Sequence, residues 1–169
     1  QFQPGSPFYN IPTAIRMTGQ LDAGALRDAL NEIITRHESL RTTFGTDNGR
    51  PVQIIAPELI VHAPLVDLCH MLPEEREAEA QRLAEEEART PFDLKRGPLL
   101  RARLVRLGER EHLALITMHH IVSDGWSMGV FVRELGILYH AFSHGQASPL
   151  PPLPIQYADY AAWQQDWLQ

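Results

Sequence analysis

Two apolar-rich runs that lie close together in the sequence constrain the fold of this chain most strongly. Residues 99–107 and 112–118 are dominated by aliphatic side chains, and the polar segment Gly108-Glu109-Arg110-Glu111 separates them. Such a pair of runs around a short turn segment predicts a β-hairpin. The longest apolar run, residues 113–118, has about six residues, whereas a membrane-spanning helix needs about 20. The sequence therefore predicts a folded domain built around a sheet, without a membrane span.

Helix-like spacing of apolar residues predicts four helices. They lie at about residues 22–37, 72–89, 127–142 and 157–169. Asp22 and Pro73 are residue types that favour the N-terminal end of a helix, and they stand at the start of the first and second helices. The third helix carries the clearest buried stripe, which consists of Met128, Phe131, Leu135, Leu138 and Phe142.

Three shorter runs predict further strands. Residues 11–18 are typical of a strand, in which Pro12 favours an edge position or a strand start because proline cannot donate to the ladder. Residues 41–44 and 51–55 flank Asp47-Asn48-Gly49, which is a strong signal for a hairpin turn.

The interleaving of these elements indicates the fold class. Strands and helices alternate along the chain, which predicts an α/β fold arranged as a layered sandwich. A length of 169 residues is typical of one domain. The proline-rich residues 148–154 predict an extended connector between elements, with a peptide-recognition ligand as the alternative.

Charge and cysteine content restrict the partners and the compartment. The chain carries 21 acidic and 15 basic residues, a net charge of −6, which disfavours nucleic-acid binding because affinity for phosphate backbones comes mostly from basic side chains. Seven glutamates lie within residues 72–89 and indicate a solvated helix face, with a docking patch for a basic partner as the alternative. The single cysteine, Cys69, excludes an internal disulfide and indicates the reducing cytoplasm.

The most informative stretch begins where the second apolar run ends. His119 and His120 follow this run, and a short loop then brings Asp124 and Gly125 to the start of the next helix. Because side chains alternate along a strand, the two histidines are expected on opposite faces, where they cannot bind one metal ion together. The histidine that faces a cleft would be a base or a hydrogen-bonding group that titrates near neutral pH.

Asp124 and Gly125 suit a helix start beside a substrate. Asp124 is expected to fix the loop, either through an ion pair or by accepting hydrogen bonds from backbone N–H groups of the helix. Gly125 allows the backbone to approach a substrate closely or to take a positive φ. The alternative is that the histidines are merely satisfied polar residues at a strand end, but the combination with Asp-Gly and a helix start favours a functional site.

No other arrangement of nucleophiles competes with this stretch. The sequence has no Gly-x-Ser-x-Gly elbow, no phosphate-cradling loop and no His-Glu-x-x-His helix. Cys69 and His70 are adjacent, but they precede the glutamate-rich helix in a loop, and Cys69 is expected to pack rather than react. The lack of a serine or cysteine nucleophile favours direct acyl transfer in a ternary complex over a covalent acyl-enzyme.

Three segments resemble motifs of one family. The run His119-His120-Ile121-Val122-Ser123-Asp124-Gly125 is similar to the His-His-x-x-x-Asp-Gly motif of the CoA-dependent acyltransferase superfamily, which includes chloramphenicol acetyltransferase and the condensation domains of nonribosomal peptide synthetases. Residues 118–130 resemble the condensation-domain version of this motif, and residues 36–44 and 157–163 resemble motifs on either side of it. The wording Ile-Val-Ser-Asp-Gly-Trp-Ser-Met-Gly at 121–129 most resembles domains that join two L-residues, and epimerisation domains usually lack its Asp-Gly-Trp-Ser part at 124–127.

The resemblance implies a chloramphenicol acetyltransferase-like lobe with a mixed sheet and packed helices. It also implies peptide-bond formation, in which a carrier-bound donor acyl group passes to the α-amine of a carrier-bound aminoacyl thioester. No cofactor would bind this chain directly, because phosphopantetheine arms would be presented by the donor and acceptor carrier domains.

The resemblance further implies residue roles. His120 would face the reacting amine as a general base or a positioning group, and His119 would support the motif structurally. Asp124 would hold the loop through an arginine, and Gly125 would keep the tunnel open for the donor thioester. Supporting residues would be Arg41, Trp126 and Ser127. Arg41 would be the candidate partner of Asp124, with an arginine outside this chain as the alternative.

Full condensation domains have two lobes and more than twice this length. Residues 1–169 are therefore expected to be the N-terminal lobe, without the extreme N-terminal motif and the C-terminal lobe, and inactive alone. The expected partners are the carrier domains, the missing lobe and neighbouring synthetase domains. Two alternatives remain: a free-standing CoA-dependent acyltransferase of the same superfamily and a non-catalytic carrier-docking module.

Overall fold

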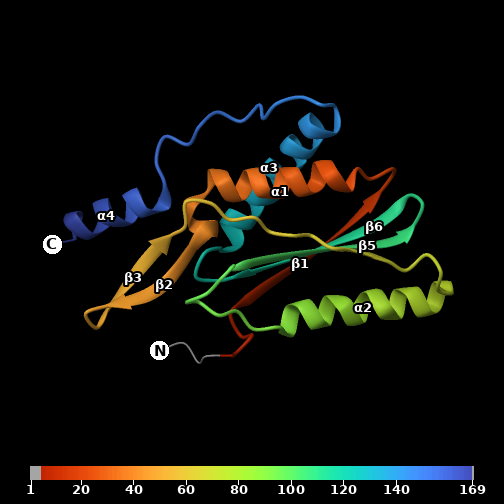
Figure 1. Ribbon diagram of the computed structural model, residues 1–169, viewed down its shortest axis with the longest axis horizontal. Coiled ribbons are helices and arrows are strands. Elements are labelled where there is room, and N and C mark those ends of the chain that lie inside the picture. The colour runs from red at the N-terminus through yellow and green to blue at the C-terminus, as the bar shows by residue number, and fades with distance from the viewer. Residues whose placement is uncertain (1–4, 169) are drawn as a thin grey trace.

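The computed structural model describes residues 5–168 (Figure 1). Within them, a four-stranded sheet and a separate two-stranded sheet combine with α-helices. The strands are β1 (Asn10–Thr18), β2 (Thr42–Asp47), β3 (Arg50–Ile55), β4 (Leu65–Asp67), β5 (Leu100–Gly108) and β6 (Glu111–His119). The helices are α1 (Ala23–Arg36), the short 3-10 helix η1 (Glu38–Arg41), α2 (Pro73–Arg89), α3 (Gly125–Ser143) and α4 (Tyr157–Trp167). Gln169, the last residue of the predicted final helix, lies outside the described residues.

The predicted hairpin of β5 and β6 forms the centre of the larger sheet, whose strand order is β1-β6-β5-β4. β5 and β6 are antiparallel, with Leu100 opposite Met118. β1 pairs with β6 and lies at the edge of the sheet, which confirms the edge position predicted from Pro12. β4, which the sequence analysis did not predict, pairs in parallel with β5 and makes the sheet mixed.

Helices cover both faces of this sheet, with α1 and α3 on one face and α2 on the other (Figure 1). Side chains of β6 alternate between the two cores. Ala114, Ile116 and Met118 pack in the core beneath α1 and α3, whereas Leu113 and Leu115 pack in the core beneath α2. This alternation decides which core each residue at the end of β6 meets.

The two-stranded sheet is the predicted hairpin around Asp47-Asn48-Gly49. β2 pairs antiparallel with β3, and both Asn48 (φ 48°) and Gly49 (φ 79°) have a positive φ, as a tight hairpin turn requires. The predicted strand 41–44 begins one residue late, because Arg41 belongs to η1.

Not every glutamate of the glutamate-rich helix α2 is exposed to solvent. Most of its acidic side chains are exposed, but Glu87 is buried and bonds two arginines of β5. Its carboxylate lies 3.2 Å from Arg101 Nε and 3.0 Å from an Arg103 guanidinium nitrogen. Glu87 therefore joins α2 to the sheet, which corrects the interpretation of the whole run as a solvated face.

Candidate active site

The two histidines at the end of β6 lie on opposite faces of the sheet, as strand alternation predicts. His119 is buried on the α2 face, where its ring lies against Tyr9 and Phe92. His120 is exposed and lines a pocket on the α1 and α3 face. One imidazole is therefore part of the core, and the other is available to a ligand.

The surroundings of His119 suit a structural role. Its Nδ1 accepts a hydrogen bond from the Ile121 N–H at 3.0 Å, so the neutral ring carries its proton on Nε2. Burial disfavours the imidazolium form and lowers the pKa of His119, and the nearby charge of His120 lowers it further. A neutral His119 ring thus fixes the turn that follows β6.

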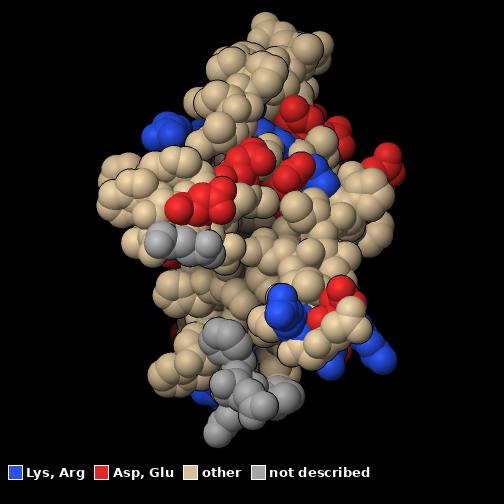
Figure 2. Space-filling model, turned by 90° about the vertical axis from the view of Figure 1, so that its left-hand side faces the viewer, with Lys and Arg blue, Asp and Glu red and all other residues tan. Residues whose placement is uncertain are grey.

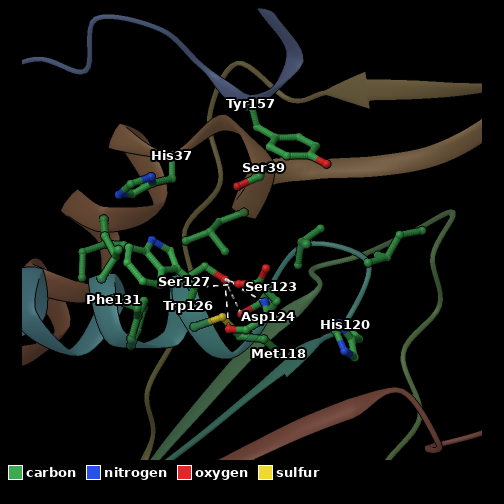
Figure 3. A pocket seen from close by; sticks show the side chains of 15 residues that line it. His37, Ser39, Met118, His120, Ser123, Asp124, Trp126, Ser127, Phe131 and Tyr157 are labelled. Carbon is green, nitrogen blue, oxygen red and sulfur yellow. Dashed lines mark hydrogen bonds between the residues drawn. The ribbon is translucent and has the colours of Figure 1, made fainter. Parts of the chain in front are cut away.

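The pocket beside His120 has a volume of about 540 Å³, within the range of small-molecule sites. It lies between the C-terminal end of α1, η1, the loop after β6 and the first turns of α3, and Tyr157 of α4 closes one side. In Figure 3, His37, Ser39 and Tyr157 lie above the pocket, whereas Trp126, Asp124 and Ser127 lie below it. The His120 backbone N–H donates to the Tyr9 carbonyl at 2.8 Å, which fixes the start of the loop.

Asp124 holds the loop as the N-cap of α3, which is one of the two arrangements expected from its position. Its Oδ1 accepts a hydrogen bond from the Ser127 N–H at 2.8 Å, and the Asp124 N–H donates to Ser127 Oγ at 2.7 Å (Figure 3). The hydrogen bonds from Ser127 lower the pKa of Asp124 and keep it ionised. Ser127 therefore supports the site directly, through the reciprocal cap.

Arg41 does not reach Asp124. Its guanidinium instead contacts Glu38, at 3.3 Å, and the Ala56 carbonyl oxygen. Within residues 5–168, the partner of Asp124 is Ser127 and the expected arginine pair is absent. The reason is local, because Arg41 sits in η1, where it spans the helix and the end of β3.

Gly125 and Trp126 form the exposed first turn of α3. The φ of Gly125 lies outside the left-handed region, and beyond its chain neighbours and the backbone of its own helix a Cβ placed there would meet no described atom within 4 Å. Gly125 does not take the positive φ that was one expected role, so close approach of the backbone to a substrate is the role that remains as a prediction. Trp126 is 86% exposed and lines the pocket, so its expected supporting role stays a prediction.

The sequence did not predict a buried ion network beside the pocket, which includes the pocket-lining His37. Glu134 of α3 is only 5% exposed, and its carboxylate lies 2.7 Å from His37 Nε2 and 3.3 Å from Arg36 Nε. Arg36 also donates to the Pro151 carbonyl of the proline-rich connector. The signal in the sequence was Glu134, which lies next to Leu135 of the apolar stripe of α3, together with Arg36 and His37 at the end of α1.

The arrangement can supply a proton acceptor at a pocket wall. The described residues contain no group of three or more potential metal ligands, and their helices include none that is long and apolar enough to cross a membrane. His120, with its ring open to the pocket, can hydrogen-bond or accept a proton from a group bound there.

Comparison with known proteins now decides the family. The family model described as "Condensation domain" matches residues 1–169, which is the whole chain. The chain belongs to the condensation-domain family. A linear gramicidin synthase polypeptide from Brevibacillus parabrevis is 52% identical over 169 residues, which are 100% of this chain and 2% of that protein. Phosphinothricin tripeptide synthetase PhsC from Streptomyces viridochromogenes is 45% identical over 168 residues, or 99% of this chain and 16% of that protein.

Solved structures confirm the predicted condensation-domain fold. The X-domain from teicoplanin biosynthesis matches with a TM-score of 0.84 and 37% identity, over 97% of this chain and 35% of that chain. The first condensation domain of the calcium-dependent antibiotic synthetase, in complex with a substrate analogue, matches with a TM-score of 0.78 and 33% identity, over 86% of this chain and 35% of that chain. This chain thus spans about a third of these solved chains and a small fraction of the synthetases.

Proposed function

We propose that residues 1–169 form the N-terminal lobe of a condensation domain that makes peptide bonds in nonribosomal peptide synthesis, of the type that joins two L-residues. The observation that carries the proposal is the placement of His120, inside the family motif, on the wall of a pocket of ligand size. The relatives that are peptide synthetases support the same reaction class.

The reaction joins an amine to a thioester. The acceptor nitrogen attacks the donor carbonyl carbon, a C–N bond forms, and the C–S bond breaks with departure of the thiolate. The nitrogen loses a proton, which His120 accepts and which finally reaches the leaving sulfur. Because an α-amino group has a reference pKa of about 7.7–8.0, a neutral fraction exists near pH 7–8, and His120 can act on the adduct or orient the amine by a hydrogen bond.

The substrates would arrive on partners. We infer that donor and acceptor carrier domains present them on phosphopantetheine arms, in the cytoplasm, and that the second lobe and neighbouring synthetase domains complete the machinery. The pocket fits an aminoacyl group on such an arm, because its walls combine an apolar floor with a few polar side chains. The floor consists of Ile33, Leu40, Met118, Val130 and Phe131.

Replacement of His120 tests the proposal. In the complete condensation domain, His120→Ala is expected to lower condensation by about 10²-fold or more, because a positioned general base contributes about that much. Product on the acceptor carrier is measured by mass spectrometry with both carriers loaded. His70→Ala, at an exposed histidine before α2, is the matched control and retains activity. Unchanged product formation by His120→Ala would exclude the catalytic assignment.

The same assay separates the alternatives. Product from CoA thioesters, but not from carrier-bound donors, would indicate a free-standing acyltransferase. Carrier binding without product from either donor would indicate a docking module. One comparison keeps the docking alternative in view, since the teicoplanin X-domain, 36% identical to this chain, has been solved in complex with another protein, OxyB.

A further inference from the structure

The C-terminal end of α3 carries two exposed histidines that lie against each other. His140 and His144 are four positions apart, a spacing that places both side chains on the same side of a helix. Their ring centroids are 4.5 Å apart. Two nitrogens that bind one tetrahedral zinc ion lie about 3.3 Å apart, which two exposed rings this close can reach by side-chain rotation. The two histidines of helical zinc sites have the same spacing.

The ring of His144 is held in a tautomer that can bind a metal ion. Its Nδ1 lies 2.7 Å from the His140 carbonyl oxygen. Because a carbonyl oxygen only accepts, Nδ1 carries the proton and Nε2 of the neutral ring has a free lone pair. Metal-binding histidines typically donate their other ring N–H to a carbonyl or a carboxylate in this way. Within residues 5–168 the His140 ring makes no hydrogen bond, so its nitrogens are available as well.

The backbone that carries the two rings is fixed. α3 ends in a Schellman motif, in which the Gly145 N–H donates to the Phe142 carbonyl at 3.0 Å and the Gln146 N–H donates to the Ala141 carbonyl at 2.9 Å. Gly145 takes the left-handed conformation that this motif favours, with a φ of 67°. The pair of imidazoles is therefore presented on an ordered helix end.

The charges near the pair favour a cation. The C-terminal end of a helix carries a partial negative charge, and an ion bound by the two histidines would lie against it. Residues 134–169 contain no lysine or arginine. The end of α3 lies at the top of the molecule in Figure 1, and the top of the face shown in Figure 2 carries no charged side chain. Lower on that face, acidic and basic side chains lie in neighbouring groups, so carboxylates there already have cationic neighbours.

We propose that His140 and His144 form a binding site for one divalent transition-metal ion such as Zn²⁺. Imidazole nitrogen suits Zn²⁺, Cu²⁺ and Ni²⁺, whereas Mg²⁺ and Ca²⁺ prefer oxygen ligands. The described residues hold no group of three or more potential metal ligands, so water or a donor from another molecule fills the remaining positions.

The site is separate from the pocket of His120. The 19 residues of α3 make a helix about 28 Å long, and the pocket lies at its first turns. The metal ion would join the last turn of α3 to the residue that caps it, which stabilises this end of the helix. The inference does not depend on the proposed reaction.

Calorimetric titration of the complete condensation domain with ZnCl₂ tests the inference, on untagged protein freed of metal by a chelator. The wild type is expected to have a site for one equivalent of Zn²⁺. His140→Ala and His144→Ala each weaken this site by about 10²-fold, because a chelate becomes a single contact. His62→Ala, at an exposed histidine outside the pair, is the matched control and keeps the affinity. MgCl₂ is expected not to bind there.

Thermal denaturation is the second measurement. Zn²⁺ is expected to raise the melting temperature of the wild type and of His62→Ala but not that of His140→Ala, since an ion bound by the folded state alone stabilises it. Unchanged zinc affinity in both variants of the pair would overturn the inference. Loss in only one of them would assign the ion to a single histidine with other partners and would also overturn it. Binding of Mg²⁺ as tight as that of Zn²⁺ would indicate oxygen ligands, with the same consequence.

Discussion

At the scale of single residues, the site shows how one side-chain type serves two purposes. His119 and His120 are neighbours with the same imidazole, yet burial lowers the pKa of His119 and keeps it neutral within the core. His120 has its ring at the pocket wall. Their environments, rather than their chemistry, divide the structural role from the proposed catalytic one.

Gly125 is expected to matter for substrate access and not for folding. Gly125→Leu adds a side chain where, beyond its chain neighbours and the backbone of its own helix, no described atom lies within 4 Å and where φ is ordinary, so the free energy of unfolding changes by less than about 1 kcal/mol. Condensation in the complete domain falls by about 10²-fold, because the leucine obstructs the donor thioester. Gly129→Leu, one turn later in α3 and also in open space, is the control and keeps activity. Equal activity of both variants would refute the access role.

Asp124 and Asp22 offer a matched pair of helix caps. Each accepts a hydrogen bond from the third residue of its helix, at 2.8 Å in α3 and 2.9 Å in α1. Replacement of either by alanine is expected to cost about 1 kcal/mol in denaturant unfolding. Only Asp124→Ala should also reduce condensation, because only that cap fixes the loop that carries His120. Equal activity losses would show that Asp124 contributes stability alone.

The cap of α3 also has a defined pH dependence. The pKa of Asp124 is lowered in the folded protein, so its contribution is complete above the unfolded value of about 3.9. The contribution is lost as the pH falls through the lower folded value. The stability difference between the wild type and Asp124→Ala should thus be constant near neutral pH and shrink below about pH 4.

Residue-level predictions from the sequence succeeded where a local rule applied. Strand alternation placed the two histidines on opposite faces, and the N-cap preference of aspartate anticipated the bond to Ser127. The Arg41–Asp124 pair was wrong, because an ion pair between distant segments depends on tertiary placement. The sequence could not predict the exposure of Trp126 either, because burial depends on which other segments pack against the side chain.

At the scale of elements, Glu134 joins α3 to the end of α1, where Arg36 in turn bonds the connector that precedes α4. Glu134→Ala leaves Arg36 and His37 without their carboxylate partner in a largely buried place. The free energy of unfolding is expected to fall by about 3 kcal/mol, as measured by denaturant titration. Glu85→Ala, which removes the exposed pair with Arg89, is the control and changes stability by less than about 0.5 kcal/mol. A loss no larger than that of the control would show that the network adds nothing to stability.

Elements with a strong local signal were predictable, and the others were not. The hairpin β2–β3 has its turn residues, and α1 and α3 have their apolar stripes. β4 has only three residues and pairs in parallel with β5, about 40 positions later, so neither alternation nor a turn announces it. Glu87 looked like its neighbours in an acidic run because its arginine partners lie on another element.

At the scale of the whole molecule, the described residues form two cores and a pocket whose wall includes His120. Under the two-lobe proposal, the 169-residue chain alone is expected to form no detectable condensation product with loaded carriers, although it displays His120, because that proposal assigns the wall that orients the donor to the second lobe. Mass spectrometry of the acceptor carrier checks this, with the complete domain as the positive control. Condensation by the short chain at the rate of the complete domain would refute the two-lobe proposal.

The candidate active site depends on the register of β6, which its pairing with β1 helps to fix. The register runs over nine residue pairs, from Thr18 opposite Glu111 to Asn10 opposite His119. A slip of β6 by one position against both of its neighbours, β1 and β5, would exchange the buried and the accessible imidazole while leaving the amino-acid composition unchanged. The site therefore depends on the position of each histidine along the strand. Odd-numbered residues of this segment face the core beneath α2, and even-numbered ones face the side of the pocket.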